Sequence, residues 1–326
     1  MKTLYVTDIT SGTIVQGETF AIVEVKAATD KNDRPYYDLT LGDRTGQVRA
    51  KIWSDNLPNV DKETLKVGKV GAIWARVEDF RGKPQLNIME LRKVDETQLE
   101  EYLESSVFPV EEMWQELMTI IGEVKNHHIR TLLENLINDV EMARRFKYWP
   151  AAVSYHHDFR SGLLQHILEC LSLARGLDKF YPEVDFDIVN AGIILHDIGK
   201  LEEIDAQGLV ARYTVKGSVL GHLYLGTQII DKYAPQDMPE KIQMHLKHIV
   251  LSHHGLKEKG SPVLPATAEA LLVSGIDEAS AKVQMGFKGV KDTPDEIGMT
   301  SYNRWLERWM WADSKVTDVS EAPTLL

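Results

Sequence analysis

Histidine and aspartate recur in the second half of the chain at points where apolar runs end. The stretch AGIILHDIGK places His196 and Asp197 directly after such a run, with Lys200 three residues later. One histidine alone is most often a satisfied structural side chain, and a single His-Asp pair arises easily by chance in a long chain. The repetition makes a shared site the stronger interpretation. The other members of the set are His166, His222, His253, His254 and Asp277.

These residue types can hold metal ions. Imidazole nitrogens with carboxylate oxygens and no thiolate suit a borderline divalent metal such as manganese, iron, zinc or nickel. If Asp197 bridges two groups of histidines, two metals can lie about 3.5–4 Å apart, the arrangement used for in-line attack at phosphorus. Bound metal would also explain why the chain brings neutral histidine and ionised aspartate into an apolar environment, where they are otherwise costly to bury.

Helices must position these side chains. Apolar residues recur three and four apart in EEMWQELMTIIGEV and IRTLLENLINDVEMA, and from there onward the pattern is helical almost throughout. Each candidate ligand is expected at the end of an apolar helical stretch, and Lys200 one turn beyond His196 on the same helix face. The tail SYNRWLERWMW also spaces its aromatic residues as on a helix, which predicts a core stripe or, less often, a subunit interface.

The first 95 residues have a different pattern, typical of strands. Segments such as ETFAIVEVKAA, YYDLTLGD, QVRAKIW, GAIWARVEDF and PQLNIMELRKV are β-branched or aromatic and are separated by Gly, Asp, Asn and Pro turn signals. About five strands in so short a span predict a small barrel.

One face of this predicted barrel could bind nucleic acid. In QVRAKIW the alternation places Arg49, Lys51 and Trp53 on one side, and FRGKP adds Arg81 and Lys83 at a hairpin tip. Basic groups beside an indole can follow a phosphate backbone while a base stacks on the ring. A solvated strand face, with the indole packed under a loop, fits the same alternation equally well.

Charge and histidine content divide the chain. Residues 1–95 hold 15 Lys+Arg and 14 Asp+Glu, a net charge of +1. The rest of the chain holds 22 Lys+Arg and 35 Asp+Glu, a net charge of −13. All eleven histidines lie between His127 and His254. With 326 residues, about two domains are expected. We predict a barrel over residues 1–95, a charged helical connector over 96–145 and a helical domain over 146–326.

Composition also limits the class of protein. The net charge of −12 argues against wrapping a nucleic-acid duplex through a broadly basic surface. No apolar run approaches the roughly 18 residues of a membrane span, and MKTLYVTDIT lacks the apolar core of a signal peptide. A soluble, cytoplasmic protein without membrane contact is expected. The single cysteine, Cys170, fits a buried thiol in a reducing compartment.

The motifs together resemble a known family. HHDFRSGLLQH, AGIILHDIGK, YTVKGSVLGH, HIVLSHHG and GID, in this order, resemble the HD phosphohydrolase superfamily. With LGDRTGQVRAKIW and VGKVGAIWARVEDFRGKPQLNI before them, they are similar to the YhaM-type 3′–5′ exoribonucleases of bacteria. The resemblance covers nearly the whole chain. It implies a multidomain α+β protein, in which a five-stranded OB-fold barrel precedes an all-α HD-domain helical bundle.

The resemblance implies an activity and residue roles. Expected is metal-dependent 3′–5′ hydrolysis of single-stranded RNA, and of single-stranded DNA as a second substrate, to nucleoside 5′-monophosphates. Mn²⁺ is the expected ion, with Mg²⁺ or another transition metal as alternatives. Lys200 would meet the scissile phosphate. The first metal would be held by His166, His196, Asp197 and Asp277, and a second metal or a phosphate by His222, His253 and His254.

Further positions carry less specific expectations. His156, His157 and Arg160 match an upstream family run and contact either substrate or the protein itself. The family often has a second aspartate three residues after the last ligand, where this chain has Ser280.

Two other functions stay open at this point. One is an HD-domain hydrolase of nucleotides or cyclic nucleotides with a regulatory barrel, against which the basic, aromatic barrel face argues mildly. The other is a non-catalytic single-strand-binding scaffold, which the full set of ligand types disfavours. A homo-oligomer is compatible with each of these functions.

Overall fold

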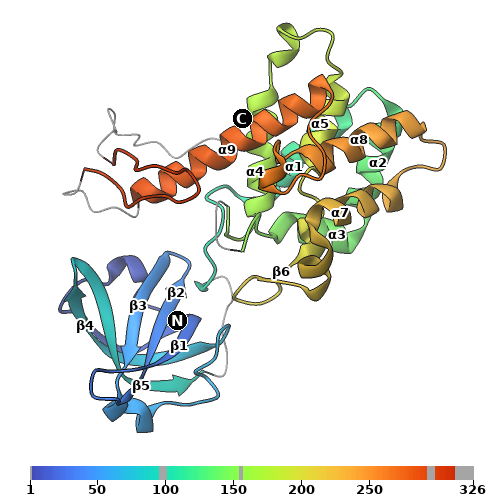
Figure 1. Cartoon of the computed structure of the whole chain (residues 1–326). Coiled ribbons are helices and arrows are strands. Elements are labelled where there is room, and N and C mark those ends of the chain that lie inside the picture. Colours follow the sequence, from blue (N-terminus) through green and yellow to red (C-terminus); the bar gives the residue numbers. More distant parts are fainter. Residues whose placement is uncertain (1, 95–100, 154–156, 292–297, 313–326) are drawn as a thin grey trace. The chain divides into compact units, whose positions relative to one another are not determined.

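The computed structural model describes residues 2–94, 101–153, 157–291 and 298–312 (Figure 1). The chain divides into two compact units. One comprises Met1–Ser105 with Ala206–Ala211, and the other Ser106–Asp205 with Arg212–Leu326. The helices expected as a separate connector therefore fall within the second unit, and a division of the chain by function stays a prediction.

The first unit is a closed five-stranded barrel, as predicted. Its strand order is β1-β2-β3-β5-β4, with β3 and β5 parallel and the other pairs antiparallel. The first strand is long enough to pair with β4 along its first half and with β2 along its second, which closes the barrel. This is the OB-fold arrangement. The strands are β1 (Ile14–Thr29), β2 (Pro35–Asp43), β3 (Gly46–Ile52), β4 (Val70–Phe80) and β5 (Lys83–Lys93).

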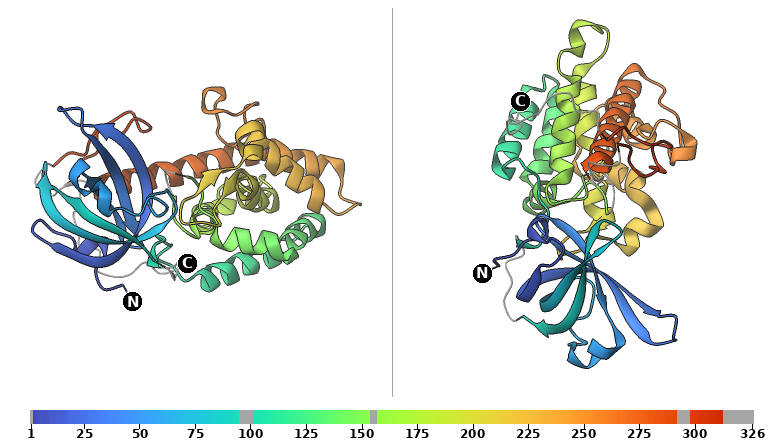
Figure 2. Two further views of the ribbon diagram at one scale, coloured as in Figure 1. Left: turned by 90° about the horizontal axis from the view of Figure 1, so that it is seen from below. Right: turned by 90° about the vertical axis from the view of Figure 1, so that its left-hand side faces the viewer.

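The barrel core follows the alternation of the strands. Val48, Ala50 and Ile52 of β3 are buried, as their spacing predicts, and they pack with apolar residues from every other strand. The opposite positions of β3 therefore point outward. The curvature of the sheet can be followed in both views of Figure 2.

The second unit is almost entirely helical. Two of its helices, α4 and α5, are apolar nearly all round, and such helices occupy the centre of a bundle. The long helix α9 packs against α4, α5 and α8. The helices are α1 (Val110–Glu123), α2 (His127–Asn138), α3 (Val140–Tyr148), α4 (Gly162–Ala174), α5 (Phe186–Leu195), α6 (Lys200–Glu203), α7 (Val215–Tyr233), α8 (Glu240–Ser252) and α9 (Ala268–Lys291), with a short hairpin of β6 (Ile204–Asp205) and β7 (Arg212–Tyr213).

The helix predicted for the tail is wrong. Residues 298–312 instead form a turn closed by bridges between Met299 and Trp311 and between Asn303 and Arg308. The Asn303 carboxamide oxygen accepts hydrogen bonds from the backbone N–H groups of Trp305 and Leu306, both at 2.9 Å. The backbone N–H groups of Asn303 and Arg308 donate to each other's carbonyl oxygens across the turn, at 2.9 and 3.3 Å, in place of helical hydrogen bonds.

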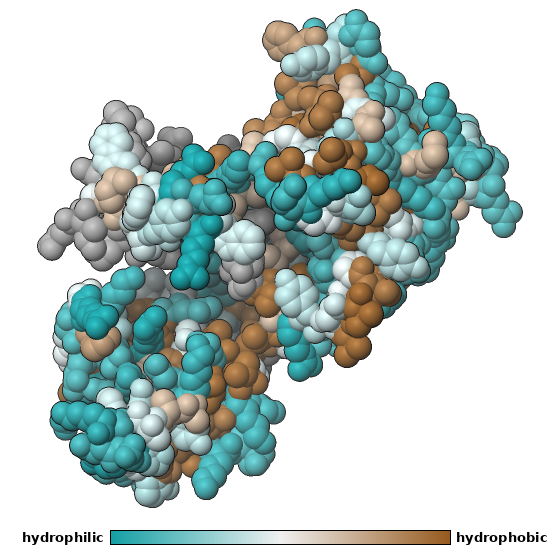
Figure 3. Space-filling view, viewed as in Figure 1, coloured by the Kyte–Doolittle hydropathy of each residue, from teal (hydrophilic) through white to brown (hydrophobic). Residues whose placement is uncertain are grey.

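Hydrophobic residues on the face drawn in Figure 3 occur in scattered patches among hydrophilic ones. Within the described ranges, none of the helices is long and apolar enough to cross a membrane. Cys170 is buried in α4, where its side chain packs beside His166.

Candidate active site

The His-Asp pair lies in a tight turn between two helices. The α5 helix ends at Leu195, residues 196–199 form the turn, and Lys200 begins α6, so Lys200 does not continue the helix that ends before His196. The turn also lies close to α7. A methyl group added at Gly199 would be 2.0 Å from the backbone oxygen of His222, so only glycine allows this approach.

The first group of ligands converges from three elements. His166 comes from the second turn of α4 and His196 directly follows α5, with 3.3 Å between their Nε2 atoms. Asp277 places its Oδ1 at 3.2 Å from Nε2 of His166 and 3.7 Å from that of His196. It lies in the middle of α9 rather than at the end of an apolar stretch, and it reaches the group because α9 packs across α4 and α5.

Asp197 joins this group to a second one. Its Oδ2 lies 3.4 Å from Nε2 of His196, while its Oδ1 lies 3.6 Å from Nε2 of both His222 and His253. Nε2 of His222 is in turn 3.3 Å from Nε2 of His254. The Oδ1 atom is buried and has no hydrogen-bond partner among the described residues. Because a buried charged oxygen without a partner is costly, a cation bound at this position would stabilise it.

The backbone determines which ring nitrogen of each histidine is protonated. Nδ1 of His196 donates to the carbonyl oxygen of Ile193 at 2.7 Å, and Nδ1 of His253 donates to that of Val250 at 2.8 Å. Nδ1 of His254 likewise donates to the carbonyl oxygen of Lys259 at 3.0 Å. Because a carbonyl only accepts, these three rings carry their proton on Nδ1 and point an Nε2 lone pair into the cluster. Lone pairs this close repel one another unless a cation lies between them.

Side chains outside the cluster orient two of its ligands, His222 and His166. These contacts were not predicted from the sequence. The Glu203 carboxylate accepts hydrogen bonds from the backbone N–H of His222, at 3.0 Å, and from its Nδ1, at 3.2 Å. Ser280 Oγ lies 3.2 Å from Nδ1 of His166 and donates to Glu169 at the same distance. Ser280 therefore orients a ligand at the position where the family often has aspartate. Spacing gives no signal for Glu203 or Glu169.

Electrostatics favour the ligand forms of these groups. Burial raises the pKa of Asp197, but the Lys200 and His196 charges outweigh it, so the pKa lies well below its usual range. Burial lowers the pKa of His166. Burial, with the neighbouring His253 and His222, lowers the pKa of His254 to about 4.

His196 is the exception among the histidines. Burial lowers its pKa, but the attraction of Asp197 outweighs burial and raises it. A metal ion at His196 would compete with a proton for the Nε2 lone pair. The pKa shifts of His166, His253 and His254 favour the neutral imidazole, and those of Asp197 and Asp277 favour the ionised carboxylate.

Two of the three upstream candidates, His157 and Arg160, lie in the described part of the chain. His157 is buried, its ring centroid is 5.2 Å from that of His166, and its Nε2 is 3.0 Å from the Glu169 carboxylate. Arg160 places its guanidinium 4.4 Å from the ring centroid of Tyr148. His156 lies outside the described residues. Contact of these three with substrate stays a prediction.

The barrel face combines a cation with two rings. Lys51 Nζ lies 4.7 Å from the ring centroid of Tyr36 and 5.1 Å from that of Trp53. The two rings are 5.1 Å apart, and the indole N–H of Trp53 donates to Asn87 at 3.1 Å. Arg49 is exposed on the same strand. Tyr36 was missed because its strand pairs with β3 only in the folded barrel.

The second basic candidate is the β4–β5 hairpin. Arg81 is in the left-handed region, with φ of 58°, and its guanidinium is 5.3 Å from the exposed ring of Phe80. Lys83 begins β5 two residues later. The tip therefore presents a basic side chain beside an aromatic ring.

Comparison of the chain with known proteins identifies its family. The HD domain family matches residues 163–282, a span that includes all seven candidate ligands. The 3′–5′ exoribonuclease YhaM of Oceanobacillus iheyensis is 36% identical over 269 residues, which cover 81% of this chain and 83% of that protein. The chain belongs to the YhaM family.

Other members of the YhaM family match to a similar extent. The 3′–5′ exoribonuclease YhaM of Bacillus subtilis is 33% identical over 258 residues, covering 78% of this chain and 81% of its own. That of Listeria welshimeri is 32% identical over 269 residues, covering 81% and 84%. Among solved structures, the second OB-fold domain of replication protein A from Methanococcus maripaludis matches 30% of this chain and 99% of its own, with 15% identity and a TM-score of 0.22.

Proposed function

We propose that this chain is a divalent-metal-dependent 3′–5′ exoribonuclease that hydrolyses single-stranded RNA, and also single-stranded DNA, to nucleoside 5′-monophosphates. The observation that carries the proposal is the buried Oδ1 of Asp197, which has no hydrogen-bond partner in the described chain and faces the Nε2 atoms of His222 and His253. The names of the YhaM relatives supply the polarity and the substrate class.

The donor set fits two ions that share Asp197. The first ion would be held by His166, His196, Asp197 and Asp277, and the second by Asp197 with His222, His253 and His254. Nitrogen and oxygen donors without thiolate suit Mn²⁺. Cys170 lies 3.9 Å from the His166 ring, but burial raises its pKa, so it stays a thiol outside the ligand set.

The protein groups complement the metal chemistry. A bound divalent ion supplies Lewis acidity toward water and toward phosphate oxygens. Lys200 Nζ is held 2.5 Å from Oδ2 of Asp197, and although burial lowers its pKa, Asp197 outweighs burial and raises it. Lys200 therefore stays charged and can stabilise negative charge that develops on a phosphate oxygen in the transition state. We assign it a catalytic role on this basis.

The barrel would hold the single-stranded nucleic acid. Bases stack on Trp53 and Tyr36, while Arg49 and Lys51 contact phosphates, with Arg81 and Lys83 as further backbone contacts. Stacking is tolerant of sequence because every base has an aromatic face. Such a surface suits an enzyme that degrades strands of many sequences.

Incubation with defined substrates tests the function. Single-stranded RNA and DNA labelled at the 5′ end, and a panel of nucleotides and cyclic nucleotides, are each treated with Mn²⁺, Mg²⁺ or a chelator. RNA should shorten progressively from its 3′ end, chelator should stop the reaction, and Mn²⁺ should restore it at least as well as Mg²⁺. Restoration by Mg²⁺ alone would count against the ligand set. Hydrolysis of nucleotides alone would favour the nucleotide hydrolase, and binding without cleavage would favour the scaffold.

The barrel face predicts a second result. Trp53→Ala should weaken RNA binding by about 1–3 kcal/mol, because one stacking contact is lost, while Trp53→Phe should retain most of the affinity. Arg49→Ala and Lys51→Ala should each weaken binding to all sequences and lower the salt slope by about 1.

This binding is measured with labelled RNA at several salt concentrations, in protein carrying Asp197→Asn so that the strand survives. Arg34→Ala is the charge control, because Arg34 is exposed and pairs with Asp30 in a separate turn of the barrel. Unchanged affinity and salt slope in the Trp53, Arg49 and Lys51 variants would mean that this face is only solvated. The single-stranded RNA would then follow the hairpin of Arg81 and Lys83.

A further inference from the structure

The turn of residues 298–312 concentrates aromatic rings at the surface. Three of the seven tryptophans of the chain lie between residues 305 and 311. Trp305, Trp309 and Trp311 are 65%, 60% and 61% exposed, and Tyr302 is 47% exposed. Large rings gathered in one short segment and left open to solvent usually mark a binding surface.

The fold of the segment holds these rings outward. Backbone hydrogen bonds join Thr300 to Met310 and Asn303 to Arg308 across the turn. Leu306 is buried, and Met310 packs on α9 so closely that a methyl group at Gly286 would lie 3.2 Å from its terminal carbon. The aromatic side chains are therefore carried by an anchored turn, and their exposure does not arise from a missing core.

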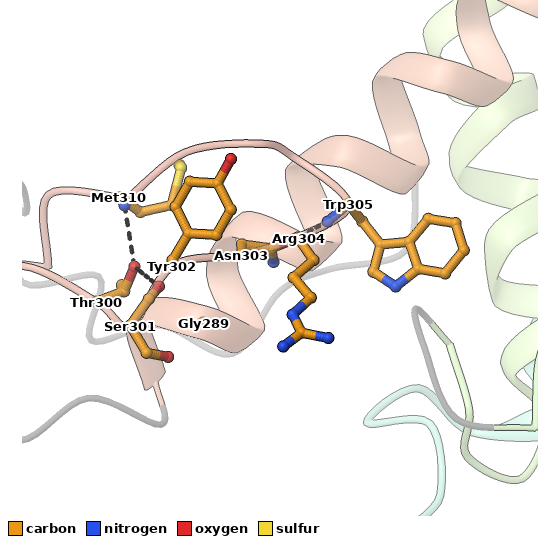
Figure 4. A pocket seen from close by; sticks show the side chains of 8 residues that line it. All are labelled: Gly289, Thr300, Ser301, Tyr302, Asn303, Arg304, Trp305 and Met310. Atoms are coloured by element: carbon orange, nitrogen blue, oxygen red, sulfur yellow. Dashed lines mark hydrogen bonds between the residues drawn. The ribbon is translucent and has the colours of Figure 1, made fainter.

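The same turn and Gly289 of α9 line an open pocket of about 350 Å³ (Figure 4). Its lining includes the rings of Tyr302 and Trp305, the Ser301 hydroxyl, the Asn303 carboxamide and the Arg304 guanidinium. Among the described residues that line it, none is acidic, although the chain as a whole has a net charge of −12. The pocket thus combines aromatic surfaces, hydrogen-bonding groups and one positive charge.

Arg304 is available to a ligand. Within the described part of the chain, no acidic group forms an ion pair with it, and its side chain is exposed. In Figure 4 it extends away from the turn, with its guanidinium clear of the other side chains drawn. By contrast, Arg308 in the same turn donates through Nε to the carbonyl oxygen of Leu306 at 2.7 Å.

We propose that this pocket binds one nucleotide of the single-stranded RNA substrate, as a contact separate from the barrel face and from the metal cluster. A base stacks on Trp305 or Tyr302, Arg304 contacts a phosphate, and Ser301 and Asn303 hydrogen-bond to the base or ribose. The positive charge of Arg304, which has no ion-pair partner among the described residues, and the polar lining favour RNA over an apolar protein partner. The inference rests on the proposed function, because that function makes single-stranded RNA the substrate.

The test compares matched variants of the full chain. RNA binding is measured by fluorescence anisotropy at several salt concentrations, with Asp197→Asn present in every protein to prevent cleavage. Trp305→Ala should raise Kd about 5- to 150-fold, the effect of losing one base stack. Arg304→Ala should lower the salt slope by about 1, and Arg304→Lys should keep it. Trp311→Ala should leave Kd unchanged, because Trp311 is equally exposed but does not line the pocket.

Four results would overturn the inference. The first is equal affinity of the Trp305→Ala, Arg304→Ala and Trp311→Ala proteins. The second is self-association of the parent protein in sedimentation that Trp305→Ala abolishes without changing RNA affinity, which would make the surface an interface between copies of the chain. If the wild-type protein shortens RNA but the Trp305→Ala protein binds RNA with unchanged affinity, the pocket inference is refuted and the proposed function stands. Wild-type protein that neither binds nor shortens RNA would refute the proposed function as well.

Discussion

Replacing Asp197 with asparagine is expected to lower RNA hydrolysis by roughly 10³-fold or more, the equivalent of several kcal/mol of lost transition-state stabilisation. The carboxylate faces His196 through one oxygen and His222 and His253 through the other. The neutral amide has the same shape, but it provides one oxygen in place of two and no charge. Bound Mn²⁺, measured by mass spectrometry after dialysis, should fall together with the activity.

Folding must be separated from metal loss in this experiment. Removal of Asp197 leaves Lys200, whose side chain is 13% exposed, without its ion-pair partner, and an unpaired charge at such a site is destabilising. The double variant Asp197→Asn with Lys200→Met removes both charges and should fold, but still bind little metal. Asp231→Asn is the control, since that surface carboxylate of α7 pairs with Lys247. Wild-type metal content in a folded Asp197→Asn protein would refute the metal site.

Replacing Lys200 with methionine should lower kcat by about 10²–10³-fold, the usual effect of removing one group that stabilises transition-state charge. Metal content should stay near that of the wild type, because the imidazole and carboxylate ligands are intact. The pair of measurements therefore distinguishes Lys200 from Asp197, whose replacement removes both metal and turnover.

Lys232→Ala provides the control for charge, because Lys232 lies on α7 with a side chain that is 62% exposed. Its replacement should change neither kcat nor metal content. If Lys200→Met turns over RNA at the wild-type rate, Lys200 serves only to pair with Asp197. If it loses metal, the ion pair positions Asp197 and the direct contact with phosphate is refuted.

The buried pair of Lys200 and Asp197 supports a functional interpretation for a general reason. Taking two charges out of water costs about as much as their attraction returns, so a buried ion pair is weak evidence for stability. The turn that holds the pair is also demanding, since Gly199 tolerates no side chain against His222. A costly pair in a constrained turn is better explained by a cation or phosphate than by folding alone.

Local patterns in the sequence were sufficient for the fold class and for the types of ligand. Alternation along β3 correctly placed Val48, Ala50 and Ile52 in the barrel core, because successive side chains of a strand point to opposite faces. Residue type alone indicated divalent metal, since imidazole and carboxylate donors have known preferences. The family resemblance, confirmed by the YhaM relatives, rested on motifs that each lie within a few residues of sequence.

Tertiary structure alone decided how these residues meet. The two oxygens of Asp197 face different groups of histidines because the turn at Gly199 lies against α7, and no spacing along the chain encodes that approach. Glu203 and Tyr36 joined their sites in the same way, through contacts between elements. In the tail, backbone hydrogen bonds between Asn303 and Arg308 close a turn where the spacing had suggested a helix. The physical reason is common to all these cases: periodicity determines which face a residue occupies, whereas packing between distant segments determines what that face touches.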